Sequence, residues 1–148
     1  MGNINWLEKL GWNEDQIEEL RFTGYAYLRQ GKYDIAVNFF KALTILDPNS
    51  LYDAQTLGAL YVQLGEHEKG IKALENALKL EGDHTPTLVN LCKALFMADK
   101  KDEGIKLAEI LQDDKSPAVA SQARALLLAF APPKPPKRKK KKSKPPAG

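Results

Sequence analysis

Cysteine is almost absent from this sequence, since Cys92 is the only one among 148 residues. A single thiol excludes an intrachain disulfide framework and a thiol-rich metal site, and it fits a reducing compartment. Long hydrophobic runs are missing too, because the longest apolar stretch, residues 125–131, is far too short to span a bilayer. Polar Asn3 and Asn5 stand where a signal peptide would be apolar. We therefore expect a cytoplasmic protein.

The sequence also lacks the groupings on which catalysis and metal binding depend. His67 and His84 have no Gly-rich loop, nucleophile elbow or metal-ligand spacing around them. Cys92 falls where helices are expected to pack, so we interpret it as a buried structural thiol. We expect no enzymatic activity, no metal, no cofactor and no small-molecule substrate.

Acidic residues are missing from the C-terminal end. All 19 acidic residues precede residue 115, whereas eight of the 22 basic residues follow residue 131, so the 14 others leave the body with a net charge of −5. Residues 132–148 are rich in proline and lysine, which predicts a disordered tail. The electrostatic part of this tail comprises Lys137, Arg138, Lys139, Lys140, Lys141 and Lys142. It fits contact with nucleic acid, an anionic membrane or an acidic protein, a nuclear import signal, or a purely solubilising role.

What the sequence does contain is an internal repeat. Gly24, Gly58 and Cys92 recur at intervals of 34 residues. The same interval separates Tyr27, Tyr61 and Leu95; Ala36, Gly70 and Gly104; and Phe40, Leu74 and Ala108. Small residues at such positions let two helices approach closely, and the large apolar residues fill the seam between them. Each unit is therefore predicted to be a helical hairpin. Its bend is expected at Gly31, at Gly65 and, in the third copy, at Asp99.

Capping signals set the expected helix boundaries. Asn13 with Gln16 resembles a capping box, and Pro86 and Pro117 suit first helical positions. The expected helices are residues 14–30, 34–46, 51–64, 67–80, 86–98, 101–112 and 117–130. A hairpin cannot bury its apolar face alone, so stacked copies should form the core and the last helix should cap it.

We divide the chain into a short helical N-terminal segment, residues 1–16, a repeat domain with its cap, residues 17–131, and the tail, residues 132–148. The apolar residues of the first segment are expected to pack on the first repeat, with contact to a partner as the alternative. They are Ile4, Trp6, Leu7, Leu10 and Trp12.

The repeats resemble the tetratricopeptide repeat family. The family pattern has a small residue, a tyrosine, an alanine, an aromatic residue and a proline at fixed positions. The first unit matches it with Gly24, Tyr27, Ala36, Phe40 and Pro48. The second unit keeps Leu57, Gly58, Tyr61, Gly65 and Ala77, whereas the third has Cys92 in the small position and no glycine at the bend. The resemblance implies an all-α solenoid of three helical hairpins plus a C-terminal capping helix.

In this family the first helix of each hairpin lines a concave face. The resemblance therefore implies a partner-binding surface made of Phe22, Tyr25, Leu28, Tyr52, Ala59, Val62, Val89, Phe96 and Met97. Some of these side chains must pack between helices, but a large contiguous apolar surface is seldom exposed without a use. Family members that clamp a chaperone's C-terminal carboxylate have Lys and Asn where this chain has Arg21 and Tyr25. An apolar protein segment is therefore the expected ligand.

The segments LRFTGYAYLRQGKYDIAVNFFKALTILDP and LGALYVQLGEHEKGIKALENALKL resemble the small type III secretion chaperones of bacteria. That resemblance implies a chaperone that holds a needle subunit or a translocator soluble before export, the needle branch acting with a small helical co-chaperone. Translocator chaperones usually carry a longer N-terminal region used in dimerisation, and the polybasic tail belongs to neither branch. The alternative is a repeat scaffold or adaptor tethered through its tail to nucleic acid, a membrane or an acidic partner.

Overall fold

The part of the chain that the structure describes, residues 5–132 of a computed structural model, is built from helices. Eight helices follow one another there without a strand. They are α1 (Trp6–Leu10), α2 (Glu14–Arg29), α3 (Tyr33–Leu46), α4 (Leu51–Gln63), α5 (His67–Leu80), α6 (Thr85–Met97), α7 (Lys101–Leu111) and α8 (Pro117–Phe130). The seven longer helices confirm the predicted ones to within one residue at each end. Apart from Pro132, the predicted disordered tail, including Lys137–Lys142, lies outside the described residues.

Side-chain caps fix where several of these helices begin. The predicted capping box is confirmed at α2, where the Gln16 amide donates to Asn13 Oδ1 at 3.1 Å and the Asn13 amide donates to Gln16 Oε1 at 2.8 Å. Ser50 and Ser116 accept from backbone amides at the starts of α4 and α8. Each cap satisfies a backbone donor that has no partner within its helix.

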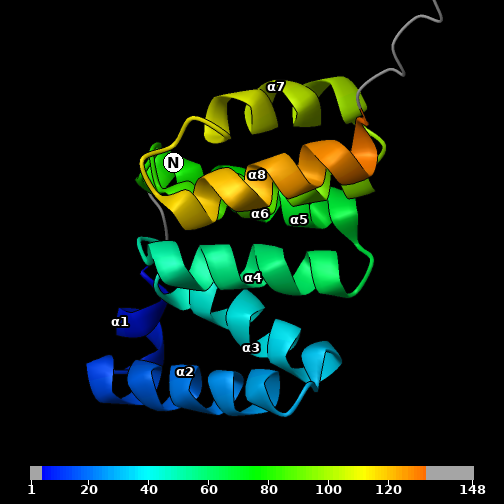
Figure 1. Cartoon of the computed structure of the whole chain (residues 1–148). Coiled ribbons are helices and arrows are strands. Elements are labelled where there is room, and N and C mark those ends of the chain that lie inside the picture. Colours follow the sequence, from blue (N-terminus) through cyan, green and yellow to red (C-terminus); the bar gives the residue numbers. More distant parts are fainter. Residues whose placement is uncertain (1–4, 133–148) are drawn as a thin grey trace, which may run out of the picture.

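The helices form three stacked hairpins, α2–α3, α4–α5 and α6–α7 (Figure 1). The last helix, α8, contacts both α6 and α7 and so caps the end of the stack. The core runs through the whole array, with Phe40, Leu43, Leu74 and Cys92 fully buried. The predicted architecture, a tetratricopeptide-like solenoid of three hairpins with a capping helix, is therefore confirmed. Between residues 5 and 132 no helix has the length and apolar character needed to cross a membrane.

The predicted small positions lie where paired helices touch. A Cβ atom added to Gly58 on α4 would lie 2.5 Å from Leu74 Cγ on α5, and one added to Gly70 would lie 2.8 Å from Val62 Cγ2. Both distances are well inside van der Waals contact, so neither position accepts a side chain without a shift. Gly24 is slightly less crowded, with an added Cβ 3.0 Å from Phe39 Cβ. The α4–α5 hairpin is therefore the most closely packed of the three.

The three bends share one backbone conformation. Gly31, Gly65 and Asp99 follow the first helices of their hairpins with φ values of 75°, 81° and 62°. Glycine adopts this left-handed region freely, whereas a residue with a Cβ atom is strained there, although aspartate tolerates it better than most. The third bend therefore keeps the geometry of the other two at some conformational cost.

Replacing Asp99 by Gly should relieve this cost. We expect the free energy of unfolding to rise by roughly 0.5 kcal/mol, because the strain removed exceeds the extra entropy that glycine gives the unfolded chain. Gly65→Ala is the reciprocal change and should lower the free energy of unfolding by roughly 1 kcal/mol. Urea titrations followed by circular dichroism measure both. A less stable Asp99→Gly protein would mean that the aspartate side chain stabilises the bend by other contacts.

The N-terminal segment packs only in part. Helix α1 contacts α3, and Trp12 is half-buried against the core of the first hairpin. Trp6 and Leu10 are exposed. Ile4 lies outside the described residues. Trp12 therefore packs on the first repeat as expected, whereas Trp6 and Leu10 remain exposed.

Candidate functional site

The first helices of the three hairpins, α2, α4 and α6, carry all the side chains predicted to bind a partner. Three of these side chains are well exposed: Phe22 on α2 at 69%, Tyr52 on α4 at 63% and Met97 on α6 at 47%. Large apolar side chains are seldom this exposed, so their exposure on three equivalent helices needs an explanation. We call the open side of α2, α4 and α6 the concave face.

Tyr25 joins the first two repeats across this face. Its hydroxyl group lies 3.3 Å from Thr56 Oγ1 on α4, and its ring meets Phe40 edge-on at a centroid distance of 5.0 Å. The ring is therefore anchored at its base while its hydroxyl end reaches the next hairpin. Leu28, one turn further along α2, is half-buried against the same core. Both residues form the floor of the concave face rather than free anchors.

A small hollow lies between the second and third repeats. Ala59, Val62 and Gln63 on α4 and Asn90 and Lys93 on α6 enclose a volume of about 130 Å³. Two of these, Ala59 and Val62, belong to the predicted set. The hollow is large enough for one aliphatic side chain, with an amide and an ammonium group at its edge.

The structure corrects the prediction for Val89 and Phe96. These side chains are only 7% and 6% exposed and belong to the core between α6, α7 and α8. The Phe96 ring stacks on Phe130 of the capping helix at 5.0 Å, with an angle of 9° between the ring planes. Because α8 covers α6, the third repeat offers less open surface than the first two. Both residues pack in the core that α8 covers, so the concave face does not include them.

An ion pair that the repeat pattern did not reveal links the first two repeats. Arg21 on α2 donates through Nε to Asp53 Oδ1 at 2.8 Å and through a terminal nitrogen to Asp53 Oδ2 at 2.7 Å. The same guanidinium reaches Asp47 at 3.0 Å and also contacts Glu18. Asp53 is fully buried, and its hydrogen bond to Arg21 raises the pKa of the guanidinium even above its ordinary value. Arg21 is thus held by three carboxylates.

Cys92 behaves as the sequence predicted. It is fully buried, and its Sγ donates a hydrogen bond to the Gly104 carbonyl oxygen at 3.4 Å. Burial raises the pKa of this thiol to about 11, so it stays protonated at neutral pH. Within residues 5–132 no group of three or more histidine, cysteine or acidic side chains is placed to hold a metal ion.

Sequence comparison matches two segments of the chain, residues 24–50 and 55–84, to the family described as "Tetratricopeptide repeat". A curated relative, tetratricopeptide repeat protein 37 of Xenopus laevis, is 27% identical over 105 residues. This match covers 71% of the chain and only 7% of that relative, so the chain corresponds to a small part of its length.

Several solved structures share the fold. The Yersinia enterocolitica type III secretion chaperone SycD, in complex with a peptide of the translocator YopD, is 20% identical with a TM-score of 0.69, covering 79% of this chain and 96% of SycD. PcrH of Pseudomonas aeruginosa, with the chaperone-binding region of PopD, is 25% identical with a TM-score of 0.70, covering 81% and 94%. The first repeat domain of Spaghetti (RPAP3), bound to the HSP90 peptide SRMEEVD, is 21% identical with a TM-score of 0.69, covering 80% and 96%.

Proposed function

Because two segments of this chain match the tetratricopeptide repeat and the fold is a stack of such hairpins, we propose that it is a chaperone whose concave face holds an apolar segment of a type III secretion substrate. The substrate is a needle subunit or a translocator that must stay soluble before export. If it is a needle subunit, the chaperone acts together with a small helical co-chaperone. The protein acts in the cytoplasm and by binding alone. The observation that carries the proposal is the exposure of Phe22 and Tyr52 on neighbouring first helices.

These two rings suit the role of anchors. Each ring lies on a helix that its neighbours hold in place. The Arg21–Asp53 pair joins α2 to α4, and α4 packs closely against α5. A rigid support spares the ordering cost that flexible anchors would incur on binding. The edge of Tyr52 also meets His84 at the start of α6, at a centroid distance of 5.8 Å, which brings the third repeat next to the same surface.

The charges on α2 favour an apolar segment over an acidic chain terminus. The carboxylate-clamping members of the family have a lysine where this chain has Arg21, and the Arg21 guanidinium already contacts Asp53, Asp47 and Glu18. A ligand carboxylate would have to displace a buried partner from Arg21. The likeness to the SycD and PcrH complexes is therefore more informative about ligand chemistry here than the likeness to the HSP90-peptide complex.

The test is a calorimetric titration of the full chain with peptides from both kinds of complex. We expect the chaperone-binding region of PopD to bind with a dissociation constant of about micromolar, and SRMEEVD to bind at least about tenfold more weakly. Phe22→Ser together with Tyr52→Ser should weaken PopD-peptide binding by about a hundredfold, because two buried aromatic anchors are lost. Phe96 does not suit this test, because it is buried and its substitution would disrupt the core.

Ile110→Ser on α7 is the matched control, since Ile110 is exposed but lies away from the concave face. It should leave peptide affinity unchanged within about twofold. Equal binding by the double variant and the wild type would rule out the concave face as the site. If the protein bound SRMEEVD more tightly, the ligand would be an acidic chain terminus and not a secretion substrate.

A truncated chain ending at Ala131 separates this function from tethering through the tail. A chaperone should keep its peptide affinity within about threefold at both low and high salt, because the tail adds only a screened attraction. Loss of all binding on truncation, with the double variant unaffected, would move the function to the basic tail.

A further inference from the structure

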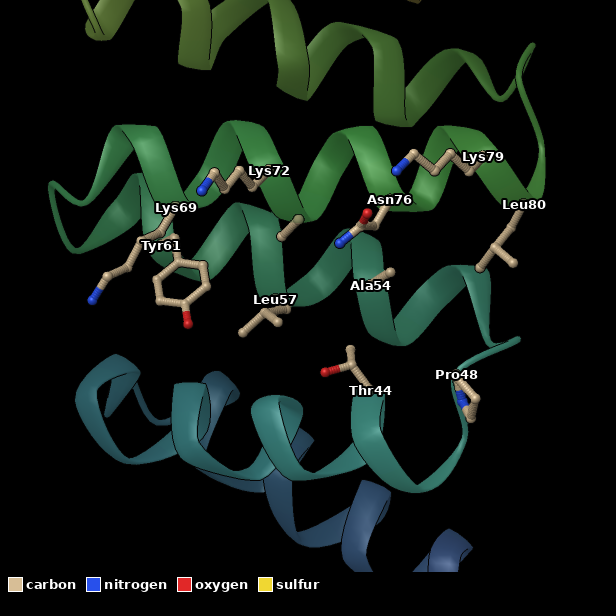
Figure 2. Close-up of a pocket in the computed structure, with 11 residues that line it drawn as sticks. Thr44, Pro48, Ala54, Leu57, Tyr61, Lys69, Lys72, Asn76, Lys79 and Leu80 are labelled. Carbon is tan, nitrogen blue, oxygen red and sulfur yellow. The ribbon is translucent and has the colours of Figure 1, made fainter. Parts of the chain in front are cut away.

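A second groove lies on the side of the solenoid away from the concave face. It runs between α3 and α5, its floor is formed by α4, and it encloses about 510 Å³ (Figure 2). The floor is apolar and includes Ala54, Leu57 and the ring of Tyr61. This volume is much larger than that of the hollow between α4 and α6, and it shares no residue with it.

One wall of this groove is a row of lysines on α5. Lys69, Lys72 and Lys79 fall on one face of the helix, with Asn76 between the last two. Figure 2 shows Lys72 and Lys79 along α5 and Lys69 reaching down beside Tyr61. The row extends over about 15 Å, or three helical turns. Thr44 and Pro48 of the first repeat form the opposite wall.

The lysines are largely free to bind a partner. Among the described residues, no acidic side chain lines the groove, and neither Lys72 nor Lys79 forms an ion pair. Lys69 pairs with the exposed Glu66, at 3.5 Å. Its ammonium group and that of Lys41 also lie 5.8 Å and 5.7 Å from the centroid of the Tyr61 ring. The ring is therefore framed by two cations at the end of a basic wall.

This basic groove contrasts with the body as a whole, whose net charge is −5. Apolar floors and unpaired cations together select a ligand that is apolar on one side and acidic on its flanks. The chain's own tail does not meet this description, since residues 132–148 contain eight basic residues and no acidic one. Residues 132–148 are therefore not the occupant.

We infer that the groove between α3 and α5 docks an acidic amphipathic helix of a second protein. Such a helix would lie along the groove, place two or three apolar side chains on Leu57 and Tyr61, and set its carboxylates against Lys72 and Lys79. The site is separate from the concave face, so the protein could hold a substrate segment and a second partner at the same time. The inference does not depend on what the concave face binds.

The test uses the full chain and a synthetic peptide of about 14 residues with a leucine stripe and glutamates on both sides of it. Calorimetry should detect binding that weakens with salt, and amide NMR shifts should centre on Leu57, Tyr61 and Lys72. Lys72→Glu with Lys79→Glu should reduce affinity by about tenfold or more, because two attractions become repulsions. Lys101→Glu with Lys106→Glu, two exposed sites on α7, is the matched control and should change affinity by less than about twofold.

Three results would overturn the inference. The first is no binding, or equal binding by the wild type and the α5 variant. The second is equal binding of a peptide whose glutamates are replaced by glutamines, which would show that charge does not select the ligand. The third is an NMR footprint on Ala59 and Val62, or concentration-dependent dimerisation that the α5 variant abolishes, which would assign the groove's role to the concave face or to a second copy of this chain.

Discussion

Replacing Arg21 by Met should lower the free energy of unfolding by about 3–5 kcal/mol. The substitution keeps most of the side-chain volume but leaves the fully buried Asp53 carboxylate without the guanidinium that pairs with it. A charge in that position has neither water nor a counterion to stabilise it. Because Arg21 lies on α2 and Asp53 on α4, the loss falls on the contact between the first and second repeats. Urea unfolding followed by circular dichroism measures it.

Two further variants make the result specific. Arg29→Met removes an exposed arginine from the end of the same helix and should change stability by less than about 0.5 kcal/mol. Adding Asp53→Leu to Arg21→Met removes the orphaned charge and should restore much of the loss. If Arg21→Met alone cost less than about 1 kcal/mol, water would have to reach Asp53, contrary to its burial.

Gly58→Leu should cost about 3 kcal/mol, at the upper end of the usual range for overpacking. The Leu74 side chain and the Gly70 carbonyl oxygen, 3.3 Å from an added Cβ atom, leave no room at the α4–α5 contact. Thermal melts followed by circular dichroism should show a lower midpoint and a native-like helical signal below it.

Gly24→Leu and Gly82→Ala test whether the loss of stability follows the space around each glycine. Gly24 has its nearest neighbours at 3.0 and 3.1 Å, so the same leucine should cost less there, about 1–2 kcal/mol. Gly82 lies in a turn where an added Cβ atom meets only the Leu78 carbonyl oxygen at 3.6 Å, and alanine there should be nearly neutral. Unchanged stability of Gly58→Leu would contradict the close approach of α4 and α5.

The helices and the repeat register were predictable because both depend on short-range patterns. The capping box at Asn13, the prolines at helix starts and the small residues 34 positions apart each carry a local physical constraint. Even the left-handed bend at Asp99 could be placed, although aspartate there is strained, because the repeat period positions it. Periodicity can identify a position without the residue type that usually marks it.

The concave face was predictable only in part. Phe22, Tyr52 and Met97 are exposed, but Phe96 is buried because the capping helix packs on the third repeat, and the repeat pattern does not say which residues the predicted cap covers. The Arg21–Asp53 pair was missed because the two residues are 32 positions apart and no motif joins them. Such a pair depends on how two hairpins pack together, which a single sequence without aligned relatives does not report. The groove on α5 was missed for the same reason, since its walls come from two different repeats.

The C-terminal end of the solenoid determines how the array could be lengthened. Helix α8 lies across α6 and α7 over 14 residues, and its outward side carries exposed Gln122 and Arg124. Leu128 is the one large apolar side chain exposed on this helix, so a new hairpin placed after it would find little to bury. Lengthening the array would therefore require inserting consensus hairpins in the turn before Ser116, so that α8 remains the last element and closes the longer protein as it closes this one.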